Sequence, residues 1–222
     1  MSWPLNEQLY CNGQFRPRMR GKLHAVCALV FPTIGSWYML PRTSKATRIA
    51  ACGYIGSQTI CYALSALYHL SNVPREAEIV LLKLDMCSIA LYEMGCFFIL
   101  YCVLPSSMAA TFASMSTATV LWHWYHIWVK HEPSPLRLAY IGATIVPFIP
   151  YLHSYLTPVE LMWMYRTIAL QTAGMIVFVS RFPDPFPTLF GYHEVFHVLV
   201  VGGGVCCFLA NMSILRRVNC DF

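Results

Sequence analysis

Continuous apolar runs, separated by short polar and proline-containing breaks, extend along the chain from residue 22 to residue 215. Each run is close to the roughly 20 residues that a helix needs to cross the hydrocarbon core of a bilayer. Strands of a membrane barrel would instead alternate lipid-facing and lumen-facing residues over about 10 residues. The pattern therefore predicts an all-α bundle of seven transmembrane helices: Lys22–Leu40, Thr47–Leu70, Leu81–Leu104, Met108–Val129, Leu136–His153, Leu161–Val179 and His193–Leu215.

Prolines mark most of the breaks between these runs. Pro41 follows the first run, Pro74 follows the second, and three prolines between residues 183 and 187 precede the last. Proline removes a helical hydrogen bond and clashes with the preceding turn, so it ends or kinks a helix. Pro147 and Pro150 fall inside the fifth run, where we expect a kink. The chain has no long linker or repeat, which predicts a single domain, 1–222.

Composition places this domain in a membrane. The chain is 57% hydrophobic and 11% charged, against about 25% charged residues in a soluble domain. The net charge is +5, but no basic tract is typical of nucleic-acid binding, so we expect no nucleic-acid partner. Most of the ten cysteines lie in apolar runs and lack metal-binding spacing, which predicts mostly free thiols.

Lysine and arginine residues orient the predicted bundle. With a cytosolic N-terminus, nine of them fall on the cytosolic side and six on the opposite side. Cytosolic loops of membrane proteins carry the excess of positive charge. We therefore expect residues 1–21 to form a cytosolic N-terminal segment and the C-terminus to lie on the opposite side. Which cellular membrane holds the protein is not indicated.

Ionisable residues stand at the ends of three predicted helices. His69 ends the second helix, Asp85 lies about one turn inside the third, and His193 and His197 begin the seventh. Successive helices cross the membrane in opposite directions, so these three ends share one layer whichever way the bundle is inserted. Ionisable groups are costly in a membrane and usually functional there. Their convergence predicts a site.

The spacing of these residues suits a metal ion. His193 and His197 are four residues apart and leave the same face of a helix, as do Ser65 and His69. Three histidines with a fourth position open to water form the pattern of catalytic zinc sites. We therefore predict Zn²⁺ held by His69, His193 and His197, with Asp85 as the general base and the Ser65 hydroxyl one turn deeper on the same face as His69.

Each residue also has a simpler interpretation. The histidines can be interfacial groups at helix ends, and the helix dipole favours Asp85 near an N-terminus. Residues 193–197 spell HExxH, the motif of soluble zinc proteases, but Glu194 is predicted to point away from the ligand face. His24, at the same end of the first helix, is interpreted as an interfacial residue, and residues 122–126 as an aromatic belt.

These residues resemble the haemolysin III family, within the wider group of progestin and adiponectin receptors and alkaline ceramidases. The similarity covers nearly the whole chain. It rests on five segments: Arg20-Gly21-Lys22-Leu23-His24, similar to an RGxLH opening; Ser65-Ala66-Leu67-Tyr68-His69, similar to SxxxH; Leu84-Asp85 with Ile89; residues 181–187, which contain Pro183-Asp184-Pro185; and residues 190–197, similar to FGxHExFH.

The resemblance implies seven helices, a cytosolic N-terminus and zinc held by His69, His193 and His197. It also implies that Asp85 orients a zinc-bound water and that Ser65 assists nearby. Many members carry histidine after the aspartate, where this chain has Met86. The glutamate and asparagine of the first helix in other members are absent here, so a calcium site like that of the alkaline ceramidases is not expected.

Together these features favour a membrane-embedded, zinc-dependent hydrolase of a lipid amide or ester, similar to a ceramidase. A receptor or sensor with structural zinc is the alternative from another class, and a membrane-lytic protein is a third. A pore is disfavoured because the polar residues are predicted to form a single layer at one mouth of the bundle. The expected partner is a membrane lipid, as substrate or ligand; protein partners are not indicated.

Overall fold

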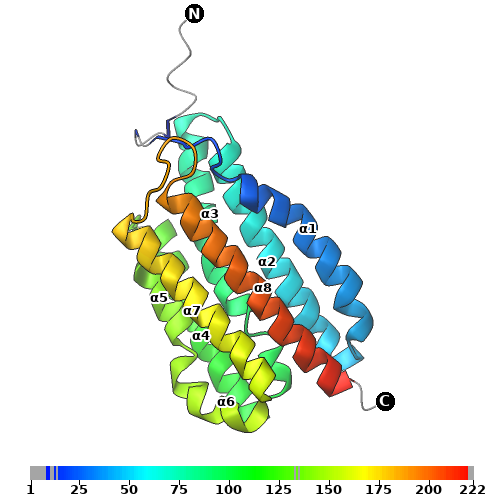
Figure 1. The fold of residues 1–222 in the computed structure, drawn as a ribbon. Coiled ribbons are helices and arrows are strands. Elements are labelled where there is room, and N and C mark those ends of the chain that lie inside the picture. Colours follow the sequence, from blue (N-terminus) through cyan, green and yellow to red (C-terminus); the bar gives the residue numbers. More distant parts are fainter. Residues whose placement is uncertain (1–8, 11–12, 14, 133, 135, 220–222) are drawn as a thin grey trace, which may run out of the picture.

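The computed structural model describes residues 9–10, 13, 15–132, 134 and 136–219, and it is all-helical apart from two isolated β-bridges. Helices α1 to α8 follow one another with three short 3-10 helices between them (Figure 1). Their bounds are α1 Lys22–Tyr38, η2 Leu40–Arg42, α2 Lys45–Leu70, α3 Arg75–Gly95, η3 Leu100–Cys102, α4 Ser106–Trp128, α5 Leu136–Ala143, η4 Val146–Phe148, α6 Ile149–Tyr155, α7 Pro158–Ser180 and α8 Tyr192–Asn219.

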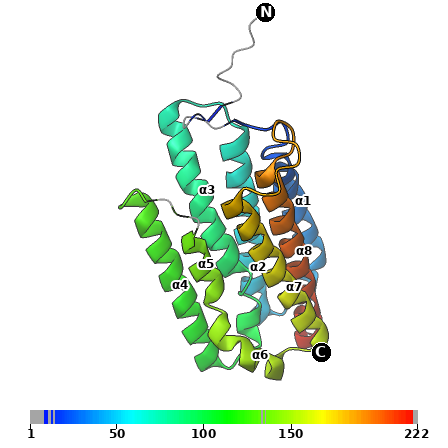
Figure 2. The same ribbon diagram turned by 60° about the vertical axis from the view of Figure 1, so that its left-hand side comes forward.

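The long helices lie side by side in one bundle (Figures 1 and 2). Helix α8 packs along α7 on one side, while α1 and α2 lie on its other side, and α3 joins α2 to α4. The N-terminal segment and the loop before α8 meet at one end of the bundle, and α8 finishes at the other. This arrangement brings the end of α2 and the beginnings of α3 and α8 to the same end.

All seven predicted stretches contain helix, with two differences of detail. The third helix begins at Arg75 and breaks after Gly95, so it starts earlier and is less continuous than predicted. The fifth is interrupted by η4, which separates α5 from α6. Pro147 lies in η4, and Pro150 is the second residue of α6. The expected kink is therefore confirmed.

Three helical stretches are long and apolar enough to cross a membrane by length and composition, among the residues that the structure describes. They are Lys22–Arg42, Arg75–Cys102 and Tyr192–Asn219. The first is little buried within the protein, so most of its apolar side chains face outwards. Outward-facing apolar side chains on a long helix are what a lipid environment requires.

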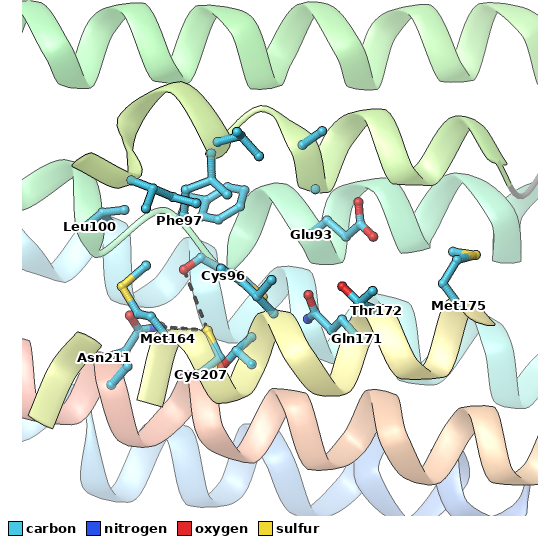
Figure 3. A pocket seen from close by; sticks show the side chains of 18 of the residues that line it. Glu93, Cys96, Phe97, Leu100, Met164, Gln171, Thr172, Met175, Cys207 and Asn211 are labelled. Atoms are coloured by element: carbon cyan, nitrogen blue, oxygen red, sulfur yellow. Dashed lines mark hydrogen bonds between the residues drawn. The ribbon is translucent and has the colours of Figure 1, made fainter. Parts of the chain in front are cut away.

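Two adjoining cavities lie inside the bundle. The first, of about 520 Å³, is at the end where α8 begins. The second, of about 300 Å³, lies deeper, between α3, α7, α8 and the broken α5–α6 stretch (Figure 3). Glu93, Gln171 and Met175 line both cavities. These shared walls make the two cavities neighbours along the length of the bundle.

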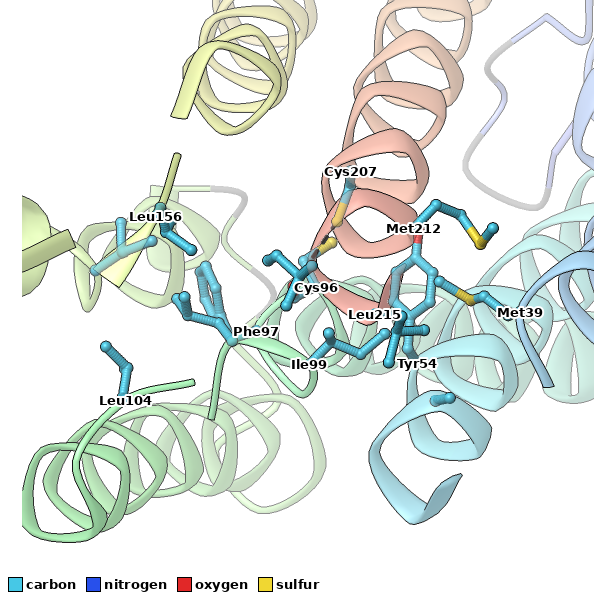
Figure 4. Packing of buried hydrophobic residues seen from close by; sticks show 14 of the residues in the cluster. Met39, Tyr54, Cys96, Phe97, Ile99, Leu104, Leu156, Cys207, Met212 and Leu215 are labelled. Atoms are coloured by element: carbon cyan, nitrogen blue, oxygen red, sulfur yellow. Dashed lines mark hydrogen bonds between the residues drawn. The ribbon is translucent and has the colours of Figure 1, made fainter. Parts of the chain in front are cut away.

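A packed apolar core fills the half of the bundle away from the start of α8 (Figure 4). Met39, Tyr54, Ile99 and Leu215 are completely buried in it. The core joins α1, α2 and α8 to the turn that follows α3. All eight cysteines of the described residues are free thiols, as the sequence predicts. The histidines predicted as ligands lie at the opposite end of the bundle.

Candidate metal site

Three histidines from two distant parts of the chain meet at the polar end of the bundle. His69 lies in the last turn of α2, and His193 and His197 lie in the first turns of α8. One ring nitrogen from each lies within 4.8 Å of the others. The ring centroids of His193 and His197 are 4.6 Å apart, and those of His69 and His193 are 4.8 Å apart. The three predicted ligands thus form one cluster.

Local hydrogen bonds fix where α8 begins. The backbone N–H of Tyr192 donates to Asp184 Oδ1 at 2.8 Å, and the N–H of Gly191 donates to Glu194 Oε2 at 2.7 Å. These carboxylates occupy N–H groups that would otherwise lack partners at a helix start. The loop with three prolines before α8 is thereby tied to the first turn of the helix. His193 and His197 follow directly.

Asp85 and Ser65 face the same cavity as the histidines. Asp85 Oδ2 is 3.8 Å from His69 Nε2, and Ser65 lies one turn before His69 on α2 and lines the same cavity. His69 Nε2 and Asp85 Oδ1 are buried and have no hydrogen-bond partner among the described residues. Buried polar atoms rarely stay unpaired, so two of them in one pocket are characteristic of a site for a bound group.

His24 belongs to this site, and its interpretation as an interfacial residue is wrong. Its ring is buried and stacks on His197 with centroids 3.8 Å apart and planes 5° from parallel. Neither ring nitrogen has a hydrogen-bond partner within the described part of the chain. The chain enters α1 at Gly21, whose φ is 76° and whose missing Cβ would lie 2.7 Å from the Cβ of His69. This close approach turns the start of α1 towards the cavity.

Tyr10 reaches the site from the N-terminal segment, where no sequence pattern pointed to it. Its hydroxyl is 2.5 Å from His69 Nδ1, and its ring stacks on Tyr68 with centroids 5.2 Å apart. The guanidinium of Arg16 lies 4.2 Å from the Tyr10 ring centroid. Burial raises the pKa of Tyr10 to about 12, so the phenol is neutral at physiological pH. Tyr10 therefore covers His69 and lines the same cavity as the histidines.

Arg20 is the second contact that sequence reasoning missed. Its guanidinium forms a buried ion pair with Glu194 Oε1, while Glu194 Oε2 accepts from the backbone of Gly191. Both carboxylate oxygens are therefore occupied. Glu194 therefore cannot act as the general base, which is the role of the glutamate in the HExxH motif of soluble proteases.

The aromatic segment at the end of α4 divides between two environments. Trp122 and Tyr125 are exposed, as an aromatic belt requires. His123 is instead completely buried, with Nε2 3.3 Å from the carbonyl oxygen of Met86 on α3. The belt interpretation is thus wrong for His123, because this side of α4 packs against α3. His123 lies outside the histidine cluster.

Polar residues also occur deeper in the bundle, so the expectation of a single polar layer at one mouth is wrong. Gln58 and Asn211 are buried, and Glu93 and Gln171 line the boundary between the two cavities. Glu93 was visible in the sequence as an ionisable residue within an apolar run.

The donor set fits a transition metal. Neutral imidazole nitrogens are preferred ligands of Zn²⁺, and the unpartnered Nε2 of His69 is aimed into the cluster. A family profile described as haemolysin-III related matches residues 13–208, which include every residue of the cluster. This family is part of the adiponectin receptor-like superfamily. The match covers most of the 222 residues and confirms the resemblance drawn from the motifs: the chain is a membrane protein that belongs to the haemolysin-III related family.

Proposed function

We propose that His69, His193 and His197 hold a zinc ion in a seven-span membrane protein and that the site hydrolyses a lipid amide or ester. The observation that carries this proposal is the cluster itself: three imidazole nitrogens within 4.8 Å, supplied by two helices and facing a cavity. Zinc bound by three histidines would polarise a carbonyl group and lower the pKa of a bound water to roughly 7.

The proposed topology has the N-terminus in the cytosol and the C-terminus on the opposite side. Helices α1, α2, α3, α4, α7 and α8 each supply one span, and α5 with α6 supplies the fifth. Non-helical backbone at membrane depth is tolerated where protein surrounds it, and η4 adjoins the second cavity. The whole chain then forms one membrane domain with the histidine cluster near the cytosolic face.

Asp85 is the residue best placed to move a proton. Its carboxyl group lies beside His69, and Oδ1 has no protein partner in the described structure. A carboxylate in this position accepts a proton from the attacking water and returns it to the leaving group. Ser65 adjoins the same carboxyl group and can donate a hydrogen bond to the oxygen on which negative charge develops. Glu194 is already paired and takes no part.

The walls of the two cavities favour a lipid. Apart from the polar cluster, the first cavity is lined by side chains such as Leu82, Ile89, Phe196 and Val200. Apolar walls with a few converging polar groups are typical of small-molecule sites. A substrate with a polar head near the histidines and an acyl chain along the cavities matches this distribution of side chains.

A receptor or sensor with structural zinc is the second candidate. It is favoured by the enclosure of the histidines, because Tyr10 and His24 pack on two of them. In that case zinc would tie α2 to α8 and no substrate would be consumed.

The experiment that separates the two candidates compares wild-type protein with Asp85→Asn in a panel of lipid amides and esters. Asn keeps the size of Asp85 but cannot accept the proton, so we expect turnover to fall by about 100-fold or more with zinc content unchanged. Wild-type zinc content without turnover of any lipid would favour the receptor. Wild-type turnover in the variant would contradict the role of Asp85.

A further inference from the structure

Glu93 places a carboxyl group between the two cavities, in the interior of the proposed membrane domain. It lies near the C-terminal end of α3 and lines both cavities. Its Oε2 atom is buried and has no hydrogen-bond partner within the described residues. A buried polar atom without a partner is costly, and an ionisable residue at membrane depth usually has a function. The mechanism proposed above does not use Glu93.

Gln171 on α7 provides the complementary group. Figure 3 shows Glu93 and Gln171 extending towards each other from α3 and α7 across the cavity. The Gln171 Nε2 atom donates to the Tyr92 hydroxyl at 3.4 Å, and that hydroxyl donates to the carbonyl of Val200 at 3.1 Å. This chain of hydrogen bonds holds the carboxamide at the boundary between the cavities. A primary amide has two N–H donors, so one remains for a ligand.

The position of Glu93 along α3 sets its distance from the histidine cluster. Asp85 and Glu93 are eight residues apart on the same helix, which corresponds to roughly 12 Å of rise. A ligand that reaches from the cluster into the second cavity must therefore pass Glu93 partway along its length. The neighbouring wall residues Met175, Cys96 and Phe97 offer it mainly apolar contacts.

We propose that Glu93 and Gln171 form a subsite for a hydroxyl group on the chain of a lipid whose polar head lies at the histidine cluster. A hydroxyl is both donor and acceptor, so it can donate to the free Glu93 oxygen and accept from the Gln171 amide. An unsubstituted chain leaves the Oε2 atom of Glu93 without a partner. The subsite deepens the proposed function, on which it rests for the placement of the head group.

The test measures binding without any turnover. The probes are octadecanoic acid, the same acid with one mid-chain hydroxyl, and octadecylamine, each titrated into the full-length wild-type protein in lipid nanodiscs. We expect the hydroxylated acid to bind about tenfold more tightly than the unsubstituted acid, the ratio that one additional buried hydrogen bond supports.

Three variants test whether Glu93 causes the tighter binding of the hydroxylated acid. Glu93→Leu should abolish the preference while leaving the affinity for octadecanoic acid unchanged, and Glu93→Gln, which keeps an acceptor, should retain most of it. Met162→Leu changes an exposed methionine of α7 that lines neither cavity and serves as the matched control. It should leave both affinities as in the wild type. Melting temperatures without ligand verify that each variant is folded.

Three results would overturn the subsite. Equal binding of both acids by the wild type is the first, and an equal loss of both in Glu93→Leu, which indicates a structural role, is the second. The third is that octadecylamine binds more tightly than either acid and that Glu93→Gln loses this binding, because that result identifies a cation site. Absence of hydrolysis or zinc leaves a measured hydroxyl preference intact, so failure of the proposed function is distinguishable from failure of this inference.

Discussion

Tyr10 contributes to the histidine cluster although it lies outside the helices. Its hydroxyl contacts Nδ1 of His69, while the buried Nε2 lies 3.8 Å from Asp85 Oδ2 and has no hydrogen-bond partner among the described residues. A ligand histidine whose second nitrogen is hydrogen-bonded has a fixed tautomer and ring orientation. Tyr10 is therefore a positioning residue for His69.

Replacing Tyr10 by Phe removes this hydroxyl and keeps the ring that stacks on Tyr68. We predict that zinc affinity falls by about tenfold, because second-nitrogen partners of ligand histidines are typically worth 10- to 100-fold. Competition with a chromophoric chelator measures the change. Unaltered affinity would show that the contact between Tyr10 and His69 does not orient the ligand.

For individual residues, the sequence allowed the three histidines to be predicted but not the side chains that contact them. His69, His193 and His197 could be predicted because they stand at the ends of apolar runs with helical spacing. Tyr10 lies in a segment without periodicity, so nothing in the sequence indicates what it touches. His24 could be placed at the right end of the bundle, but only packing shows that its ring stacks on His197.

The N-terminal segment and the loop before α8 hold each other in place. The backbone N–H groups of Arg18 and Met19 donate to the carbonyl oxygens of Thr188 and Leu189. Arg20 adds the buried ion pair with Glu194. The start of α8, which carries His193 and His197, is thus fixed by residues that precede α1.

Removing one partner of this ion pair leaves an uncompensated buried charge. We predict that Arg20→Met lowers the free energy of unfolding by about 3 to 5 kcal/mol, seen as a lower melting temperature in detergent. Arg18→Met, which changes an exposed arginine of the same segment, is the matched control.

A second substitution isolates the charge. Glu194→Gln keeps an acceptor for the Gly191 N–H but carries no charge, so the double variant Arg20→Met/Glu194→Gln should recover much of the lost stability. A double variant as unstable as Arg20→Met alone would indicate that lost packing, and not the unpaired charge, causes the effect.

The elements themselves were largely predictable because prolines and apolar runs mark them. The break between α5 and α6 follows from Pro147 and Pro150. The early start of α3 at Arg75 was not predicted, since its first turn contains Arg75, Glu76 and Glu78 and lacks an apolar run. This turn projects beyond the apolar part of the bundle, where Glu78 pairs with Arg16.

For the whole molecule, the proposed topology puts the histidine end of the bundle on the cytosolic side. Asn72, between α2 and α3, is exposed at that end, and Lys45, at the start of α2, is exposed at the other. We predict that a membrane-impermeant thiol reagent labels Asn72→Cys only from the cytosolic side and Lys45→Cys only from the opposite side. The unsubstituted chain corrects for its native cysteines. Labelling of both positions from one side would contradict the topology.

The zinc content of the purified protein tests the central claim most directly, because the cluster joins parts of the chain more than 100 residues apart. Elemental mass spectrometry should find about one zinc per chain in the wild type, and a loss in both His69→Ala and His197→Ala. His153→Ala, at an exposed histidine of α6 outside the cluster, should keep the metal. A wild-type protein without zinc after supplementation, or zinc retained in both cluster variants, would contradict the account.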